Sequence, residues 1–246
     1  MVRILAVIPA RYASVRFPGK PLVQIDDRPM VQWVYEAAKQ CSAFSHVVVA
    51  TDSAEIADCV QSFGGAVEIT SSDHATGTDR VAEVAERYPD IEVVVNVQGD
   101  QPFVTAAMLL QLIQPYLDGE RPEMTTLACP LDQETGYRDP NVVKVICDQY
   151  QNALYFSRAS IPYYRNTTSA PVFHHLGLYA FRRDFLAQYA TLTPTPLEYC
   201  EALEQLRVLE HGYRIRVCRT EAAVPEINTP EDLIAAQHWI ASSVAL

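Results

Sequence analysis

The chain has 246 residues, an apolar fraction of 49% and a formal net charge of −11. This length allows one large domain, or a domain with a smaller elaboration, around a sizeable hydrophobic core. The acidic balance argues against general nucleic-acid binding, which needs a basic surface, but a few local cations still allow a small anionic ligand.

The sequence predicts a cytoplasmic protein without a membrane segment. The apolar run at residues 4–8 is too short for a signal peptide, and no run approaches the roughly 18 apolar residues of a membrane span. The cysteines have neither CxxC pairing nor zinc spacing, so buried, reduced thiols are expected at Cys41, Cys59, Cys129, Cys147, Cys200 and Cys218.

Short apolar runs alternate with helical patterns over the first half of the chain. Ser53 is the predicted N-cap of the second helix. The alternation predicts a parallel sheet with helices on both faces. The expected strands are residues 4–8, 46–50, 66–70 and 91–97, and the expected helices are 29–41, 53–63, 77–88 and 105–117.

The pattern changes after about residue 120, where strand-like runs follow one another with few helices between them. We expect a mixed or antiparallel sheet here, within a single domain of residues 1–246 that carries a β-rich arm at about 120–200. Thr229 is the predicted N-cap of the last helix. The expected strands are residues 124–130, 142–148, 153–157, 176–181, 214–219 and 224–228, and the expected helices are 197–212 and 230–243.

Three cations follow the first strand in the stretch IPARYASVRFPGK, namely Arg11, Arg16 and Lys20. The pair Pro18-Gly19 forces a turn before Lys20. In open α/β sheets, ligands bind at the carboxyl ends of the strands, and turn N–H groups with nearby cations suit phosphates. The stretch is neither a Walker A loop nor a GxGxxG motif. It predicts a phosphate site, the alternative being a solvated surface loop.

A second polar group follows the fourth strand, in VVVNVQGDQP at residues 93–102. The strand brings Asp100 to the same sheet edge as the cationic loop, with Gly99 allowing a bend. A carboxylate beside a triphosphate is a ligand that Mg²⁺ prefers. We therefore predict a magnesium site, the alternative being a turn-forming or helix-capping aspartate.

Blocks over the whole chain resemble 3-deoxy-manno-octulosonate cytidylyltransferases, the CMP-Kdo synthetases. The resemblance implies a Rossmann-like, GT-A-like α/β nucleotidyltransferase fold, with a mainly parallel sheet and a small β-rich arm used for homodimerisation. It implies transfer of CMP from CTP to Kdo with Mg²⁺, releasing pyrophosphate, for lipopolysaccharide assembly. The blocks are IPARYASVRFPGKPL, VATD, HATGTDRVAEV, VNVQGDQP, DPNVVKV, ALYFSRASIP, HLGLYAFR, LEQLRVL and NTPEDL.

The resemblance also implies roles for single residues. Arg11 and Lys20 match the cations that hold the triphosphate, Asp100 matches the metal-binding aspartate, and all three are the expected catalytic residues. Arg158 suits the sugar carboxylate, because a guanidinium binds that group through two parallel hydrogen bonds. The other nucleotide-binding candidates are Ala10, Ser72, His74, Gly77 and Thr78. The remaining sugar-binding candidates are Gln98, His175, Tyr179, Glu204 and Gln205.

The sequence departs from the family pattern at two acids. Asn228 replaces the aspartate that is the second metal ligand in the family, and Gln101 stands where the family usually has glutamate. The Asn228 carbonyl can still coordinate Mg²⁺ without bringing charge. Glu226 offers a substitute ligand, because residues two apart on a strand face the same side.

These departures leave several functions open. One is CMP transfer to a different acidic acceptor, such as a modified Kdo or another carboxylate or phosphonate, and another is a catalytically weak CTP-binding paralogue. A nucleotide-sugar glycosyltransferase is disfavoured because no Asp-x-Asp pair follows the fourth strand. Of the adjacent His174 and His175, one is expected to point inward, to a sugar hydroxyl or into the core. Glu198 and Glu201 are expected on a solvated helix face.

Overall fold

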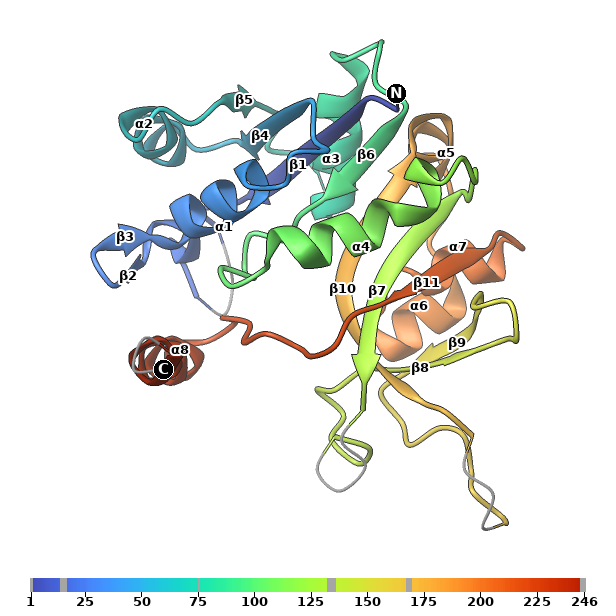
Figure 1. The fold of residues 1–246 in the computed structure, drawn as a ribbon. Helices are drawn as coiled ribbons and strands as arrows, with labels where there is room; N and C mark the ends of the chain where they lie inside the picture. The colour runs from blue at the N-terminus through green and yellow to red at the C-terminus, as the bar shows by residue number, and fades with distance from the viewer. Residues whose placement is uncertain (1, 14–16, 75, 132–135, 167–169, 244–246) are drawn as a thin grey trace. The chain divides into compact units, whose positions relative to one another are not determined.

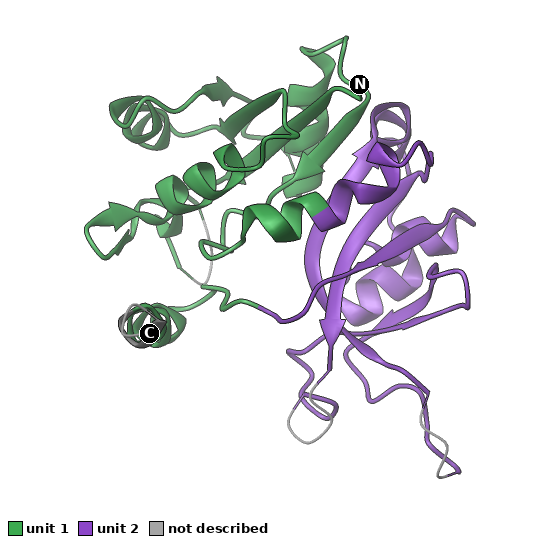
Figure 2. Cartoon of the chain, in the orientation of Figure 1, with its two compact units in different colours: residues 1–110, 224–246 green, residues 111–223 purple. Residues whose placement is uncertain are grey.

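The computed structural model describes residues 2–13, 17–74, 76–131, 136–166 and 170–243. The chain divides into two compact units, one of residues 1–110 and 224–246 and one of residues 111–223 (Figure 2). The first unit therefore combines the N-terminal half with the C-terminal end of the chain. That the whole chain acts as one domain with a dimerisation arm stays a prediction.

The first unit is built on a parallel sheet in the order β5-β4-β1-β6 (Figure 1). The central strand β1 places Ala6 opposite both Val47 and Val95. These strands are rich in β-branched residues and mostly buried, as parallel strands covered on two faces are. The predicted parallel sheet is confirmed, with β1 (Ile4–Ala10), β4 (His46–Thr51), β5 (Val67–Ile69) and β6 (Val93–Asn96).

Helices cover this sheet on both sides, with α1 in front of it and α3 behind it in the view of Figure 1. The strand order reverses between β1 and β6, which makes the carboxyl ends of these two strands the point where such sheets bind ligands. Ser53 caps α2 as predicted, accepting the Ile56 N–H at 3.4 Å. The helices are α1 (Met30–Lys39), α2 (Ala54–Ser62), α3 (Gly77–Glu86) and α8 (Pro230–Ser243), and the unit boundary falls within α4 (Ala106–Leu117).

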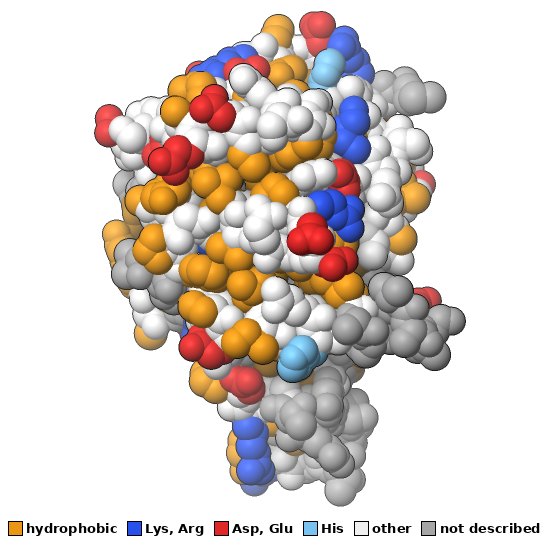
Figure 3. All heavy atoms as spheres, turned by 90° about the vertical axis from the view of Figure 1, so that its left-hand side faces the viewer, with side chains coloured by type: hydrophobic (Ala, Val, Ile, Leu, Met, Phe, Trp, Pro, Cys, Tyr) orange, Lys and Arg blue, Asp and Glu red, His pale blue; other side chains and the backbone are white. Residues whose placement is uncertain are grey.

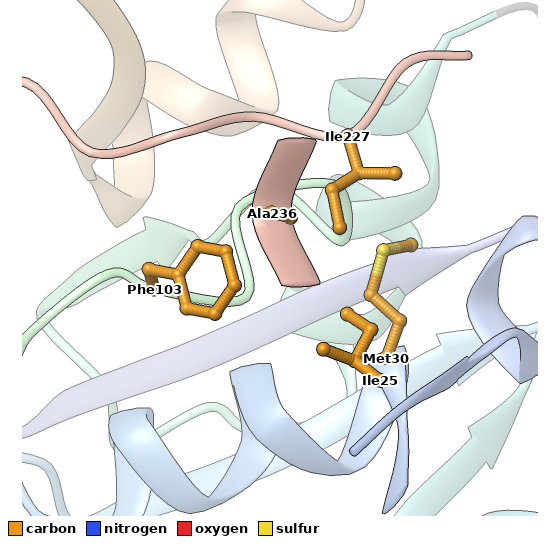
Figure 4. Close-up of a cluster of buried hydrophobic side chains, with 5 residues drawn as sticks. All are labelled: Ile25, Met30, Phe103, Ile227 and Ala236. Atoms are coloured by element: carbon orange, nitrogen blue, oxygen red, sulfur yellow. The ribbon is translucent and has the colours of Figure 1, made fainter. Parts of the chain in front are cut away.

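One hydrophobic cluster ties the C-terminal segment to the rest of the first unit (Figure 4). Ile227 and Ala236 pack with Ile25, Met30 and Phe103, each at most 7% exposed. The Ile227 N–H also donates to the Asp100 carbonyl at 2.9 Å. Residues far apart in the sequence are therefore fixed beside the loop that follows β6.

The second unit is mainly antiparallel, as predicted for this half of the chain. Its strand β7 pairs antiparallel with β10 and parallel with β11, and β8 pairs antiparallel with β9 and β10. The strands are β7 (Met124–Pro130), β8 (Lys144–Cys147), β9 (Ala153–Ser157), β10 (Phe173–Arg182) and β11 (Ile215–Arg219). The helices are α5 (Arg183–Tyr189), α6 (Pro196–Glu201) and α7 (Leu206–Glu210).

Several predicted elements are wrong. The helix expected at 197–212 is two short helices, because Ala202 has a left-handed backbone (φ 51°) that ends α6. Residues 224–228 form no strand. The helix α5, the short helix η1 (Lys20–Leu22) and the hairpin of β2 (Gln24–Ile25) and β3 (Arg28–Pro29) were not expected from the pattern.

The space-filling view shows how charged and apolar side chains are distributed over one face of the molecule (Figure 3). In the face drawn in Figure 3, Lys and Arg side chains are scattered among acidic and apolar groups, without a continuous basic stripe among the described residues. Within the described part of the chain, every helix is too short or too polar to cross a bilayer. All six cysteines are free; Cys41, Cys129 and Cys218 are buried, but Cys200 is exposed, against expectation.

Truncating Ile227 tests whether the cluster holds the C-terminal segment in place. Ile227→Ala is expected to lower the free energy of unfolding by about 2–5 kcal/mol, because it leaves a cavity in a fully buried site. Urea titration measures this change. Ile234→Ala, at a position 56% exposed on α8, is the matched control and should shift it by less than about 0.5 kcal/mol. Equal losses in both variants would contradict the assignment.

Candidate active site

A pocket of about 390 Å³ lies in the first unit at the carboxyl ends of β1 and β6. The predicted catalytic residues Arg11, Lys20 and Asp100 all line it. The sheet edge therefore brings together the two sequence stretches that predict phosphate and metal binding. The remaining lining residues are Pro9, Ala10, Ala13, Pro21, Gly77, Gln98 and Gly99.

The turn before Lys20 is closed by backbone hydrogen bonds. Gly19 has φ 70°, a left-handed conformation that glycine adopts without strain, and its N–H donates to the Tyr12 carbonyl at 2.9 Å. The Lys20 N–H donates to the Phe17 carbonyl at 3.2 Å, and Lys20 then begins η1. This turn directs Lys20 into the pocket, whereas Arg16 lies outside the described residues.

Gly99 allows the loop after β6 to approach β1 closely. A Cβ atom at this position would lie 2.8 Å from the Pro9 carbonyl oxygen, which is too close for any other residue without a backbone shift. The Val97 N–H donates to the Val7 carbonyl at 2.9 Å just before this approach. The absence of a side chain at Gly99 therefore sets the position of Asp100.

Two oxygen ligands converge on one ammonium group in the pocket region. The Lys20 Nζ donates to Asp100 Oδ2 at 3.1 Å and to Asn228 Oδ1 at 3.5 Å. The Lys20 side chain is 14% exposed and that of Asp100 is 27% exposed, so solvent screens this pair less than a surface ion pair. A carboxylate and an amide oxygen that already face one cation are a donor set that fits a hard divalent ion.

Glu226 lies near Lys20 and Asp100, and its carboxylate accepts hydrogen bonds from the amide side chains of Gln101 and Asn228, the two residues that depart from the family pattern. Gln101 Nε2 donates to Glu226 Oε1 at 2.8 Å, and Asn228 Nδ2 donates to Glu226 Oε2 at 3.4 Å. The residue as a whole is exposed, but protein atoms crowd its carboxylate. This desolvation, followed by the nearby Asp100 charge, raises the pKa of Glu226.

The predicted nucleotide-binding loop is anchored to α3 through Glu83. The Glu83 carboxylate accepts the Ser71 N–H at 2.9 Å and contacts His74 Nε2 at 2.5 Å. Desolvation opposes its ionisation, but these contacts and the Arg87 charge outweigh that and lower the pKa of Glu83. Ser72 is exposed and His74 is engaged with Glu83, and neither lines the pocket.

Gly77 and Thr78 begin α3, and only the first of them reaches the pocket. Thr78 is 1% exposed, and its hydroxyl accepts a hydrogen bond from Asn96 Nδ2 at 3.2 Å. This bond joins the first turn of α3 to the end of β6. Thr78 therefore lies where it can position the pocket wall, while its role toward a nucleotide stays a prediction.

Three of the predicted sugar-binding residues form a buried network in the second unit. Thr126 donates its hydroxyl hydrogen to the Leu178 carbonyl at 2.8 Å, so the 2.8 Å contact with His175 requires Nε2 of the histidine to be the donor. Gln205 Nε2 lies 3.5 Å from His175 Nδ1, and Tyr179 donates to Gln205 Oε1 at 3.1 Å. His175 is thus the inward member of the histidine pair.

Burial, and to a smaller extent the neighbouring His174, lowers the pKa of His175 to about 3. The ring is therefore neutral over the physiological pH range. A neutral ring with a fixed tautomer orders Tyr179 and Gln205 in the core of the second unit. Whether any of the three contacts a sugar stays a prediction.

Arg158 has most of its hydrogen-bonding capacity directed at backbone carbonyls. It donates to the carbonyls of Pro140, Glu201 and Ala202 at 3.0, 2.8 and 3.5 Å. The buried Lys144 in turn donates to the Arg158 carbonyl at 2.7 Å, so two loops of the second unit are joined by both cations. The structure thus gives Arg158 an architectural role, and its predicted contact with a sugar carboxylate is untested.

The solvated helix face expected around Glu198 and Glu201 is wrong. Glu198 makes a bidentate ion pair with Arg207 at 2.8 and 2.5 Å. Glu201 accepts the Ser157 hydroxyl at 2.6 Å and the Arg158 N–H at 2.9 Å. Glutamates at three-residue spacing gave no sign of these distant partners. Glu204, a predicted sugar-binding residue, is half-buried in the turn before α7.

Comparison with known proteins assigns the chain to a family. A family model described as cytidylyltransferase matches residues 5–215. The chain belongs to the cytidylyltransferase family. Both the fold and the family membership expected from the sequence blocks are confirmed.

Relatives in this family match the chain over nearly its whole length. A 3-deoxy-manno-octulosonate cytidylyltransferase of Acaryochloris marina is 67% identical over 239 residues, covering 97% of this chain and 98% of the relative. One from Synechococcus elongatus is 58% identical, with the same coverage. A solved CMP:2-keto-3-deoxy-manno-octonic acid synthetase in complex with CTP is 39% identical, with a TM-score of 0.93 over 98% of this chain and 99% of its own.

The pKa of His175 predicts how stability depends on pH. Its folded-state value of about 3 lies below the ordinary 6.5, so between these values the unfolded chain binds a proton that the folded chain does not. This contribution to stability is complete above pH 6.5 and is lost as the pH falls. The free energy of unfolding of the wild type should thus fall by up to about 1.4 kcal/mol per pH unit more steeply than that of His175→Gln.

Urea titrations of both proteins at several pH values between about 4 and 7 measure this difference in slope. Each protein serves as its own reference at neutral pH, where the histidine is uncharged in both states and the slopes should agree. Parallel curves over the whole range would show that folding does not lower the pKa of His175.

Proposed function

We propose that this cytidylyltransferase transfers CMP from CTP to the anomeric hydroxyl of Kdo and releases pyrophosphate. The observation that carries the proposal is the joint lining of one pocket by Arg11, Lys20 and Asp100 at the strand-order reversal. Relatives named for this activity support it, since they match 97% of this chain at 67% and 58% identity. The same chemistry would serve the activation of this sugar acid for lipopolysaccharide-type assembly.

In this proposal the chain acts by positioning its substrates and balancing their charge. Arg11 and Lys20 bind the triphosphate and stabilise the leaving pyrophosphate, as charged donors do in other phosphoryl transfers. Ala10, Gly77 and the loop of Ser72 and His74 contact the rest of the nucleotide. In-line attack on the α-phosphorus then depends on how the acceptor hydroxyl is oriented.

The acidic side of the pocket suits Mg²⁺. Asp100 and Asn228 would hold the ion, since their oxygens already converge on the Lys20 ammonium. A bound Mg²⁺ neutralises phosphate charge and polarises a phosphoryl oxygen. Of this pair of ligands only Asp100 brings a formal charge.

The remaining assignments concern the acceptor and the surroundings of the enzyme. Exposed apolar side chains in the second unit, including Tyr163 at 87% and Leu154 at 59%, support a homodimer formed through this part of the chain. Six free cysteines support a reducing compartment such as the cytoplasm. The proposed acceptor-binding residues are Gln98, Arg158, His175, Tyr179, Glu204 and Gln205.

Pyrophosphate release tests the reaction and its acceptor. The purified chain with CTP and Mg²⁺ is expected to release pyrophosphate when Kdo is added and to form CMP-Kdo in equal amount, measured by a coupled assay and by mass spectrometry. A panel of other acidic sugars and phosphonates is the comparison. If another acid is turned over and Kdo is not, that acid is the acceptor in place of Kdo. If the chain binds CTP but turns over no acceptor, it is a non-catalytic paralogue.

Substituting the two charged residues tests the site. Lys20→Ala should weaken CTP binding by about 10–100-fold, because it removes a charge-assisted hydrogen bond to phosphate. Asp100→Asn should lower the rate at least ten-fold, since it removes the charge of a metal ligand. Calorimetry and the pyrophosphate assay measure the two effects. Lys39→Ala on the exposed end of α1 is the control, and wild-type values in the folded Lys20 and Asp100 variants would refute the assignment.

A further inference from the structure

The two amides that depart from the family pattern contact the same carboxylate. Gln101 Nε2 lies 2.8 Å from one oxygen of Glu226, and Asn228 Nδ2 lies 3.4 Å from the other. Gln101 is 3% exposed, so its hydrogen bond to Glu226 is made in a protected environment. The sequence predicts two losses of charge at one site, and the structure joins the two amides through Glu226.

The backbone explains why Glu226 and Asn228 face the same place. Ile227 between them is fully buried in the hydrophobic cluster, and its N–H donates to the Asp100 carbonyl at 2.9 Å. Its two neighbours in the chain both make contacts at this place, Glu226 with Gln101 and Asn228 with Lys20. The buried isoleucine therefore holds both neighbours beside the loop of Asp100 and Gln101.

The contacts of Asn228 fix the orientation of its amide. The amide oxygen accepts a hydrogen bond from the Lys20 ammonium, and the amide nitrogen donates one to the Glu226 carboxylate. The oxygen therefore faces a cation and the nitrogen faces an anion. An aspartate at position 228 would repel the Glu226 carboxylate and could not donate a hydrogen bond to it. A glutamate at position 101 would likewise repel Glu226 and remove the hydrogen bond that Gln101 donates. Amides at both positions therefore allow an ionised carboxylate at Glu226 beside Asp100.

We propose that Glu226, oriented by Gln101 and Asn228, is the second charged ligand of the divalent cation beside Asp100, in place of the aspartate that the family carries at position 228. This inference rests on the proposed function, since it concerns the metal of the same site. Gln101 is a positioning residue, because it acts through the Glu226 carboxylate. The acid has thus moved by two residues along the chain while staying at the same sheet edge.

Metal affinity tests this proposal without relying on turnover. Mn²⁺ is titrated into the CTP-loaded protein, and free Mn²⁺ is read from its electron paramagnetic resonance signal, with CTP alone as the blank. Glu226→Gln should weaken Mn²⁺ binding by about 10–100-fold, and Glu221→Gln, an exposed acid five residues earlier, should leave it unchanged. Wild-type affinity in a folded Glu226→Gln protein, or no Mn²⁺ binding by the wild type, overturns the proposal.

A reciprocal exchange separates a ligand from a structural residue. Adding Asn228→Asp to Glu226→Gln returns the acid to position 228 and should restore Mn²⁺ affinity to within about three-fold of the wild type. Gln101→Leu keeps the acid but removes its 2.8 Å donor, so it should weaken Mn²⁺ binding by about ten-fold with CTP binding in EDTA unchanged. No recovery in the exchanged protein, or an unchanged Gln101→Leu protein, overturns the role assigned to that residue.

The same measurements distinguish this proposal from the proposed function. If wild-type protein releases pyrophosphate with Kdo but Glu226→Gln binds Mn²⁺ normally, only the assignment of Glu226 fails. If the wild type neither binds CTP nor releases pyrophosphate with any acceptor, the proposed function fails first. Thermal unfolding of each variant confirms that a loss of affinity is not a loss of fold.

Discussion

The site depends on one backbone hydrogen bond and the buried side chain that accompanies it. The Ile227 N–H donates to the Asp100 carbonyl, and the Ile227 side chain packs with Ile25, Met30 and Phe103. Apolar burial supplies the free energy, and the hydrogen bond fixes the register between two segments that are far apart in sequence. Together with the hydrogen bond from Gln101 to Glu226, this contact fixes the amide and carboxylate near residue 228 relative to the loop after β6.

The electrostatics of the site follow from that placement. In a chain with a net charge of −11, an anionic ligand needs local cations, and Lys20 is held between the oxygens of Asp100 and Asn228. The same ammonium offsets the repulsion between Asp100 and Glu226. The Lys20 ammonium therefore stabilises the carboxylates of Asp100 and Glu226 and is stabilised by them. A bound triphosphate would take over contacts with Lys20, and its metal ion would take over contacts with the carboxylates.

The sequence predicted what is local and repetitive. Runs of β-branched residues gave the parallel strands, Ser53 gave a cap, and turn residues placed Lys20 and Asp100 at one sheet edge. It failed where a long-range partner decides the conformation. Alanine favours helices, so nothing in residues 197–212 showed the left-handed break at Ala202. The network of His175, Thr126 and Gln205 likewise joins three separate segments that no periodicity connects.

The amides at residues 101 and 228 are a second case in which contacts between distant residues decide the outcome, here the distribution of charge at the site. Judged position by position, each amide is an acid lost, and two losses at one site suggest weakened chemistry. In the folded chain both amides donate to Glu226, which the sequence offered as a substitute ligand only through its spacing of two residues from Asn228. That spacing assumed a strand, which residues 224–228 do not form, so it could not show that Glu226 and Asn228 lie together. The hydrogen bonds from Gln101 and Asn228 to Glu226 show it. The backbone hydrogen bond from Ile227 to the Asp100 carbonyl holds this segment beside the loop, so an acid at position 226 reaches the same sheet edge as an acid at position 228 would.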